Sequence, residues 1–471
     1  METECKDRLS IRLSTVMEDI GVTVELVNFR RYITRVREYV KTIMHMNGWK
    51  DVATFHFVGS QIEGSTTLGM DSDYDFLITD RGIFTAYTDL SEFCPLQSYS
   101  TFLYLAIKNT YSFPQCVCLQ RVIYIGENIL FPVSAKYFDM KRKDLSEHLL
   151  DEDGRELLSN EIVINNLVYP NYSLHSSGIV EQHEPALNLM GYADSVFCIQ
   201  CDQTLPRDCQ VLFERPKPGH WPKEKTLYKA KTQCAVFFMY PGNIGHTSSY
   251  DSSSRMINMD IRHPTIYASR QWRMSTVSIE LLLMCDLDIV QMKTYVLMKM
   301  IRIQFLKPLV ADRLSTFHMK TAFLFAIEKY PPRIWTNENL VQCVLFGLRT
   351  LRRFLKHRFC PHYSIACVDL FAEKLRVWEV RPLIAELTRI INSNLQCVYE
   401  INIDKLGKRL NAYRTGHDSE LVSRSVYRLW TLSPLITCFN YIYLGSYDIY
   451  TNDDINQMEL NFKRAEPEET E

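Results

Sequence analysis

Residues 51–80, DVATFHFVGSQIEGSTTLGMDSDYDFLITD, decide the fold of this chain. The first ten residues form a short apolar run that ends in Gly59-Ser60, and residues 72–79 alternate polar and apolar side chains. Both patterns are typical of β-strands. The Gly- and Thr-rich residues between them are typical of a turn. This stretch therefore predicts a strand, a turn and a second strand.

The start of the second strand carries Asp73 and Asp75, two residues apart. In an extended strand such residues point to the same side, so both carboxylates face one point. Mg²⁺ and Mn²⁺ prefer oxygen ligands of this kind. Gly59 and Ser60 can present backbone N–H groups to a phosphate. Together these features predict a two-metal nucleotidyltransferase site, in which the ions stabilise the attacking hydroxyl and the leaving pyrophosphate.

A simpler interpretation of the acidic residues also has to be considered. Asp71, Ser72 and Asp73 are good turn formers, and they could precede an exposed strand without binding anything. Asp71 would then be one more turn residue, and in the metal-site interpretation it is a spare carboxylate. The combined pattern of Gly-Ser, a Glu-Gly turn and Ser-Asp-x-Asp favours the metal site.

A third carboxylate from a neighbouring strand normally completes such a site. Asp194 is the preferred candidate because it begins the apolar run SVFCIQC, residues 195–201, which predicts another strand. Asp202 and Asp208 are the competing candidates.

The rest of the chain divides into two parts. Helical periodicity over residues 10–46 and strand-like stretches over 84–140 precede a charged run at 141–175, which we interpret as a helix and loop. Long periodic helices follow residue 271, and 471 residues are too many for one core. We therefore predict an α+β, bilobal fold in which a mixed β-sheet catalytic lobe, residues 1–270, packs on a C-terminal helical bundle, 271–455, before a disordered acidic tail, 456–471.

Composition limits the setting in which the protein works. Lys and Arg (53) nearly balance Asp and Glu (55), so any nucleic-acid surface must be local. No secretory signal or long apolar run appears, which predicts a cytoplasmic chain with no membrane contact and leaves nuclear entry open. Cys198 and Cys201 have zinc-ribbon spacing, but no second pair matches them, so we expect reduced thiols and no structural zinc.

Several ordered motifs extend beyond the acidic residues. They are HEPALNL at 183–189 before Asp194, Trp272-Arg273-Met274-Ser275, Gln291-x-Lys293 through Lys299, LSTFHMKTAFLFAIEK at 314–329, Trp335-x-x-Glu338-Asn339-Leu340 and His362-Tyr363-Ser364-Ile365. In this order they resemble the Mab-21 family, which includes cyclic GMP-AMP synthase and the animal cGAS-like receptors. The resemblance covers residues 10 to about 375. It implies the nucleotidyltransferase fold and a nucleotide site between the sheet and the helices.

The resemblance also implies roles for four residues of the helical part. Arg273 would contact a nucleobase, Lys299 and Ser315 would bind phosphate, and Phe317 would stack on a base. From the residues alone, Arg273 could equally form an ion pair between the lobes, Lys299 could be an ordinary helix lysine, and Phe317 could be a core residue.

The implied activity is the joining of nucleoside triphosphates, ATP and GTP, into a cyclic dinucleotide in innate immune signalling. The zinc insertion of cyclic GMP-AMP synthase is missing after Ser275, which favours double-stranded RNA or another ligand over double-stranded DNA as activator. Four residues at helical spacing could contact phosphates, although a solvated face explains them as well: Arg349, Arg352, Arg353 and Lys356. A non-catalytic family member and a template-independent RNA polymerase are the alternative functions.

Overall fold

The computed structural model describes residues 2–49, 53–67, 69–70, 72, 74–80, 84–90, 102–108, 112, 114–125, 129–134, 148–162, 180–183, 186–189, 193–202, 205–241, 265–372 and 374–415. All of them belong to a unit that spans Met1–Val422. Asp71, Asp73 and the predicted tail at 456–471 lie outside the described residues.

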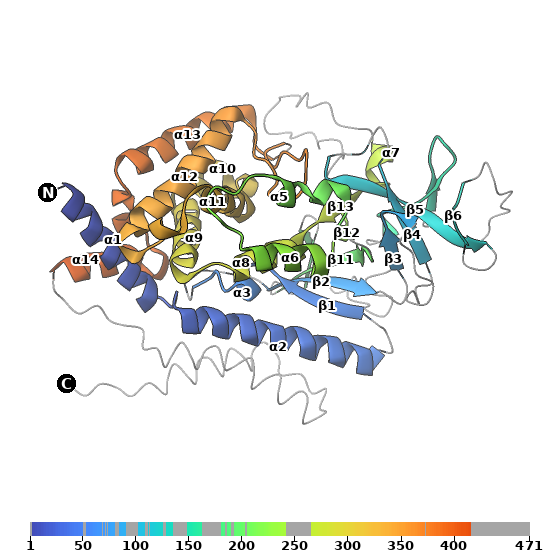
Figure 1. Ribbon diagram of the computed structural model, residues 1–471, viewed down its shortest axis with the longest axis horizontal. Helices are drawn as coiled ribbons and strands as arrows, with labels where there is room; N and C mark the ends of the chain where they lie inside the picture. Colours follow the sequence, from blue (N-terminus) through green and yellow to red (C-terminus); the bar gives the residue numbers. More distant parts are fainter. Residues whose placement is uncertain are drawn as a thin grey trace. The chain divides into compact units, whose positions relative to one another are not determined.

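A mixed β-sheet forms the first half of this unit, as the sequence predicted (Figure 1). Its strands are β1 (Ala53–Val58), β2 (Tyr74–Asp80), β3 (Phe84–Tyr87), β4 (Phe102–Ile107), β5 (Cys116–Ile125), β6 (Ile129–Pro132), β7 (His148–Leu150), β8 (Glu156–Leu158), β9 (Val180–His183), β10 (Ala186–Leu189), β11 (Ala193–Gln200), β12 (Phe237–Met239) and β13 (Trp272–Ser275). The main path runs β1-β2-β11-β12-β13-β5-β4-β3. β2 is parallel to β11 and β3 is parallel to β4, whereas the other pairs along this path are antiparallel.

The helical periodicity at the N-terminus corresponds to two helices, α1 (Glu2–Asp19) and α2 (Val24–Trp49). The chain turns between them at Gly21, whose φ of 93° suits glycine. α2 covers the sheet's edge strand β1, because Glu38 and Thr42 accept hydrogen bonds from its outward-facing backbone amides at 2.6 and 3.2 Å. A helix that satisfies the free N–H groups of an edge strand protects it from pairing with other chains.

The prediction of a helix and loop within 141–175 is wrong for the described residues 148–158. Residues 148–158 form the antiparallel hairpin of β7 and β8. Asp151 closes the turn between these strands by accepting hydrogen bonds from the backbone of Asp153 and Arg155 at 3.0 and 2.8 Å. Gly154 adopts a φ of 76° in the same turn. The sequence Asp-Glu-Asp-Gly is a turn signal, and the surrounding charges concealed it.

Short helices lie between strands of the sheet. They are α3 (Gly59–Glu63), η4 (Arg207–Cys209), α5 (Val211–Glu214), α6 (Glu224–Gln233) and α7 (Thr265–Ala268). The segment after residue 271 starts with strand β13, so the continuous helical region begins only at α8. This region is the helical C-terminal part that the sequence predicted, and the chain is therefore an α+β protein.

The helical region contains α8 (Val277–Cys285), α9 (Ile289–Ile301), α10 (Lys307–Val310), α11 (Thr316–Lys329), α12 (Leu340–His357), α13 (Val377–Asn392) and α14 (Leu406–Thr415). A π-helical stretch, η5 (Arg302–Leu306), continues α9, and short 3₁₀ turns lie between the longer helices: η6 (Ala311–Arg313), η7 (Pro332–Ile334), η8 (Asn337–Asn339), η9 (Gln396–Glu400) and η10 (Ile403–Lys405). Figure 1 shows α9, α11, α12 and α13 packed together. No helix among the described residues is long and apolar enough to cross a bilayer.

The N-terminal helix α1 is tied to this bundle through a buried lysine. Lys293 on α9 is fully buried and donates hydrogen bonds to Glu18 at 2.6 Å and Ser14 at 2.8 Å. Ser14 in turn donates to Asn337 in η8 at 2.7 Å. α1 therefore packs on the helical region and α2 on the sheet.

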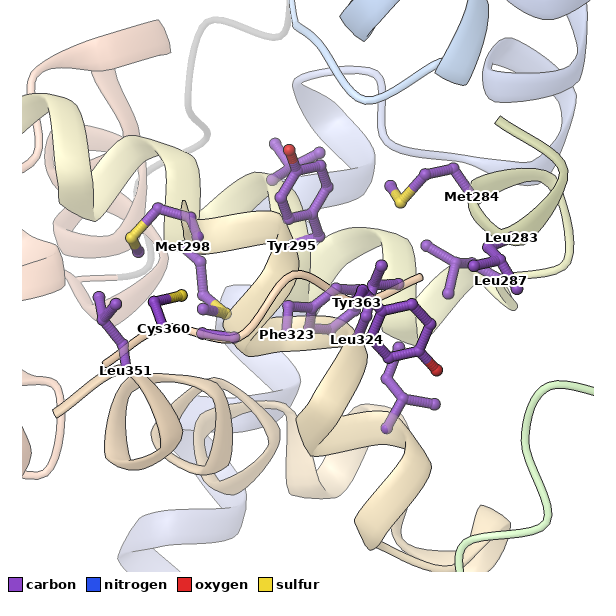
Figure 2. Close-up of a cluster of buried hydrophobic side chains, with 14 of the residues drawn as sticks. Leu283, Met284, Leu287, Tyr295, Met298, Phe323, Leu324, Leu351, Cys360 and Tyr363 are labelled. Atoms are coloured by element: carbon purple, nitrogen blue, oxygen red, sulfur yellow. The ribbon is translucent and has the colours of Figure 1, made fainter. Parts of the chain in front are cut away.

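Apolar side chains from α8, α9, α11 and α12 fill the centre of the bundle (Figure 2). Phe323 stacks on Tyr295 with ring centroids 5.5 Å apart. Leu324 and Leu351 are almost fully buried in the same cluster. Tyr363 places its hydroxyl 2.7 Å from the buried Glu328, which satisfies the one polar atom of that ring.

The buried cluster predicts a clear difference between two leucines. Replacing Leu351 by Ala leaves a cavity in the bundle and should lower the free energy of unfolding by about 2–5 kcal/mol. Leu309 is 43% exposed on α10, so Leu309→Ala should change it by less than about 0.5 kcal/mol. Equilibrium urea unfolding measures both, and equal midpoints for the two variants would contradict this packing.

Candidate functional site

Two of the three predicted carboxylates lie on neighbouring strands in the same register. β2 and β11 are parallel, and Asp75 is paired with Asp194 across them. Residues directly opposite each other on adjacent strands project to the same face of a sheet, with strand axes about 4.8 Å apart. The pairing therefore places two carboxylates side by side at the beginning of both strands.

Gly59 makes this arrangement possible because it lies against the carboxylate of Asp75. Val58, the residue before it, is paired with Asp75 across β1 and β2. A Cβ atom added to Gly59 would lie 2.2 Å from Asp75 Oδ2, and its φ of 78° also favours glycine. The backbone thus approaches Asp75 as closely as it can, at the point where α3 begins.

Ser60 and Gln61 fix the segment that leads into β2. Ser60 Oγ lies 2.5 Å from Ser72 Oγ, and Gln61 Nε2 donates to the carbonyl oxygen of Ser72 at 3.0 Å. Asp73 lies between Ser72 and Tyr74, where β2 begins, and it is outside the described residues. Its predicted role as a ligand therefore stays a prediction.

The competing carboxylates lie elsewhere. Asp202 follows the far end of β11, eight residues from Asp194, which corresponds to about 26 Å along an extended strand. Asp208 in η4 forms an ion pair with Lys108. Of the three candidates, only Asp194 lies beside Asp75.

A buried ion cluster lies at the end of α3, and sequence reasoning missed it. Lys320 on α11 forms an ion pair with Glu63 of α3 and lies 3.8 Å from Glu280 of α8. All three side chains are buried. Burial acts to lower the pKa of Lys320, but attraction to Glu63, Tyr295 and Glu280 outweighs it and raises this pKa. Burial raises the pKa of Glu280. Only the Glu63-Gly64 turn was noticeable in the sequence, because Lys320 comes from a distant helix.

Lys299 connects the same turn to α9. Its Nζ donates to the carbonyl oxygen of Ser65 at 2.9 Å, and the side chain is buried. Burial lowers the pKa of Lys299 to about 8, against the attraction of Glu63 and Asp75 and with the help of the positive charges of Lys320 and Arg302. The protonated form of such a buried lysine is favoured when a negative group approaches.

His362 is influenced by both Arg273 and Phe317. Arg273 on β13 is half-buried, and its charge helps burial to lower the pKa of His362 to about 3. The half-buried ring of Phe317 lies 5.5 Å from the ring of His362 and 5.9 Å from Lys320 Nζ. The pairing of β11, β12 and β13 also puts Arg273 on the same sheet face as Asp194.

Ser315 lies at the start of α11, where its hydroxyl is engaged with His318. The Nε2 atom of His318 lies 2.9 Å from the carbonyl oxygen of Leu370, so this nitrogen is the donor of the neutral ring. Nδ1 then accepts from the backbone N–H and the hydroxyl of Ser315, each at 3.0 Å. A phosphate contact would require the hydroxyl hydrogen to turn away from His318.

The four basic residues of α12 do not behave alike. Arg349, Arg353 and Lys356 are exposed. Arg352 is half-buried and donates to Thr388 Oγ1 of α13 at 3.3 Å, because α12 packs against α13 along this side. Three of the four positions can therefore meet a ligand at the surface, and Arg352 also serves the helix contact.

The cysteine pair with zinc-ribbon spacing is buried in the sheet. Cys198 Sγ donates to the carbonyl oxygen of Ile78 at 3.6 Å, and burial raises its pKa. Within the described ranges, no three His, Cys, Asp or Glu side chains form a group that could hold a metal ion. The predicted triad is not judged by this result, because Asp73 lies outside those ranges. The donor set at Asp75 and Asp194, two oxygen-bearing groups in register, suits a hard divalent cation.

A comparison with protein-family models matches residues 291–388 to the Mab-21 protein HhH/H2TH-like domain. The matched segment runs from α9 to α13. It includes Lys299, Ser315, Phe317 and Lys320. The family is nucleotidyltransferase-like, and the helical part of this chain is the part that matches its model.

The buried position of Lys299 predicts an unusual titration. In protein labelled with ¹³C at lysine Cε, one signal should titrate near pH 8 and disappear in Lys299→Arg, whereas the similarly lowered signal of Lys41 should remain. Because the folded pKa lies below the unfolded value, the unfolded chain binds more protons between about pH 8 and 10.5, and the contribution of Lys299 to stability rises with pH there. A Lys299 signal that titrates near 10.5 would contradict its burial.

Proposed function

Because this chain belongs to the Mab-21 family, we propose that it is a metal-dependent nucleotidyltransferase that joins two nucleoside triphosphates, such as ATP and GTP, into a cyclic dinucleotide. The observation that carries the proposal is the in-register pairing of Asp75 and Asp194 on parallel strands, with Gly59 against Asp75. This pairing supports a site at which two carboxylates converge on one small volume. Asp73 would complete the triad.

The donor groups fit a pair of Mg²⁺ or Mn²⁺ ions, which Asp73, Asp75 and Asp194 would hold. When bound, such ions supply charge neutralisation at the reacting phosphate and lower the pKa of the attacking hydroxyl. A cyclic dinucleotide needs two displacements. In each, a hydroxyl of one nucleotide would lose its proton and form a bond to the α-phosphorus of the other, while the bond from that phosphorus to pyrophosphate breaks. The protein contributes mainly position and charge to such a reaction.

Several residues of this chain would hold the triphosphate. The backbone of Gly59 and Ser60 would face the leaving pyrophosphate. Lys299, whose burial disfavours its charge, would bind a phosphate, since an anion restores the preference for the protonated amine. Ser315 would add a hydrogen bond once its hydroxyl turns from His318.

The bases would be held on the side of the site that carries Arg273 and Phe317. Both residues are half-buried, so each keeps part of its surface for a ligand. Phe317 would stack on a base, and Arg273 would donate to one. The proximity of both to His362, whose ring is neutral near pH 7, supports a shared binding surface without a competing positive charge.

We further propose that double-stranded RNA or another anionic ligand activates the enzyme. The exposed Arg349, Arg353 and Lys356 lie on successive turns of α12, which suits contacts to phosphates without sequence preference. Arg352 would contribute less because it also bonds Thr388.

The test is an incubation of the purified full chain with four labelled nucleoside triphosphates and Mg²⁺ or Mn²⁺, with and without double-stranded RNA or DNA. We expect a phosphatase-resistant dinucleotide. Asp75→Asn and Asp194→Asn should each lower its rate by more than about 100-fold, the upper end of the loss seen when only an outer-shell partner of a metal is removed. Asp202→Asn and Asp208→Asn are the matched controls and should keep the wild-type rate.

Each outcome of this experiment separates two functions. Polymeric products in place of dinucleotides would favour the template-independent polymerase. Folded protein that binds nucleotide without turnover under every condition would favour a non-catalytic family member. Equal losses in all four Asp variants would argue against Asp75 and Asp194 as the special pair.

The close approach of Gly59 to Asp75 predicts the effect of one added methyl group. Gly59→Ala should lower the turnover number at least about tenfold, because the new Cβ must displace the Asp75 carboxylate and small displacements of reacting groups are costly. Gly154→Ala is the control, since Gly154 has a similar φ of 76° in the remote β7–β8 turn. The two variants share the backbone strain, so equal turnover would show that the contact with Asp75 is unimportant.

A further inference from the structure

The segment between α3 and β2 is held from three directions. Lys299 bonds the carbonyl oxygen of Ser65 near its beginning, and Ser60 and Gln61 hold Ser72 near its end. Between these two anchors, Thr67 and Gly69 donate hydrogen bonds to Asp404. Asp404 belongs to η10, more than 300 residues later in the chain. Neither the proposed chemistry nor the sequence motifs account for this third anchor.

Asp404 uses both of its carboxylate oxygens on this segment. Oδ2 accepts a hydrogen bond from Thr67 Oγ1 at 2.5 Å, and Oδ1 accepts one from the backbone N–H of Gly69 at 2.8 Å. A Cβ atom on Gly69 would lie 2.8 Å from Oδ1 and 2.9 Å from the backbone nitrogen of Asp404. The backbones at Gly69 and Asp404 therefore approach as closely as a glycine allows.

Arg409 and Arg30 stabilise Asp404 in this position. It adopts a left-handed conformation, with φ 51° and ψ 23°, which costs energy for a residue with a side chain and is tolerated best by Asp and Asn. Arg409 Nε donates to its carbonyl oxygen at 3.0 Å. The charge of the buried Arg30 on α2 also attracts its carboxylate.

We propose that Asp404 is a positioning residue of the metal site. By fixing Thr67 and Gly69, it would hold the segment that leads to β2 and so help to place Asp75 beside Asp194. The inference rests on the proposed function for its consequence in catalysis, whereas the hold on the segment can be tested without any turnover. Asp404 does not touch the reacting atoms and acts only through this segment.

Three variants and one control test the proposal. Asp404→Ala removes both acceptors, Thr67→Val removes one donor and keeps the shape, and Asp404→Asn keeps an acceptor for Gly69 and a polar partner for Thr67. Glu400→Gln is the control, because it neutralises an exposed carboxylate in η9, just before η10. Thermal unfolding shows which variants are folded.

The first measurement is hydrogen–deuterium exchange in peptides that contain Gly69. Asp404→Ala should speed the exchange of this amide at least about tenfold, since its acceptor is lost. Asp404→Asn should restore slow exchange, and Glu400→Gln should match the wild type. Wild-type exchange in a folded Asp404→Ala protein would overturn the proposal.

The second measurement is Mn²⁺ binding, followed by electron paramagnetic resonance in the presence of a non-hydrolysable ATP analogue. Asp404→Ala should weaken Mn²⁺ binding and lower the turnover number by roughly 10-fold, as loss of a supporting residue around a metal does, with little change in the KM for nucleotide. Thr67→Val should weaken Mn²⁺ binding and lower the turnover number to a smaller extent. The double variant should bind Mn²⁺ and turn over like Asp404→Ala alone.

The two proposals fail in different ways. Wild-type protein that binds no Mn²⁺ and makes no product would overturn the proposed function, while the exchange result would still decide whether Asp404 holds the segment. Wild-type Mn²⁺ affinity and turnover in Asp404→Ala would overturn only the positioning role. If Asp404→Ala does not fold, Thr67→Val must show the same pattern in smaller measure, and its absence would overturn the proposal.

Discussion

The ion cluster of Glu63, Lys320 and Glu280 is the interaction on which the rest of the structure depends. One lysine serves two buried carboxylates from two different elements, and loss of a partner in a buried ion pair typically costs about 3–5 kcal/mol. Removing Lys320 would leave two buried carboxylates without their shared positive partner, and removing Glu63 would leave the buried Lys320 with only Glu280 at 3.8 Å. α3, α8 and α11 are therefore held together, and Arg31 of α2 reinforces the junction by donating to the carbonyl oxygens of Glu63 and Met284 at 2.9 and 2.8 Å.

This cluster makes the sheet and the helices one unit at the point where the proposed chemistry takes place. α3 begins at Gly59, against Asp75, and ends at Glu63, against Lys320. The five-residue helix α3 thus contacts Asp75 of the sheet at its first residue and Lys320 of α11 at its last. The contact between α11 and the residue that faces Asp75 therefore spans only the five residues of α3.

Sequence reasoning reached the local elements and stopped at the long-range ones. The strands around Gly59 and Asp75 and the strand after Asp194 follow from alternation and turn residues, which are local signals. The choice of Asp194 rested on a strand beginning, and the register that brings it beside Asp75 is a parallel pairing that no local pattern encodes. Lys320 and Asp404 were missed for the same reason, since Glu63 and Thr67, their partners near the site, lie hundreds of residues away. The β7–β8 hairpin was missed because charged residues hid a short Asp-Gly turn.

The family match and the carboxylates occupy different parts of the chain, and the buried contacts explain how one can bear on the other. The matched segment, residues 291–388, contains neither Asp75 nor Asp194. It does contain Lys299 and Lys320, which bond Ser65 and Glu63 just after Gly59. Each lysine is buried and has a specific acceptor in the turn, so replacing either one in this chain should disturb the turn. The segment that matches the Mab-21 domain model is thus in direct contact with the turn that begins at Gly59, beside Asp75.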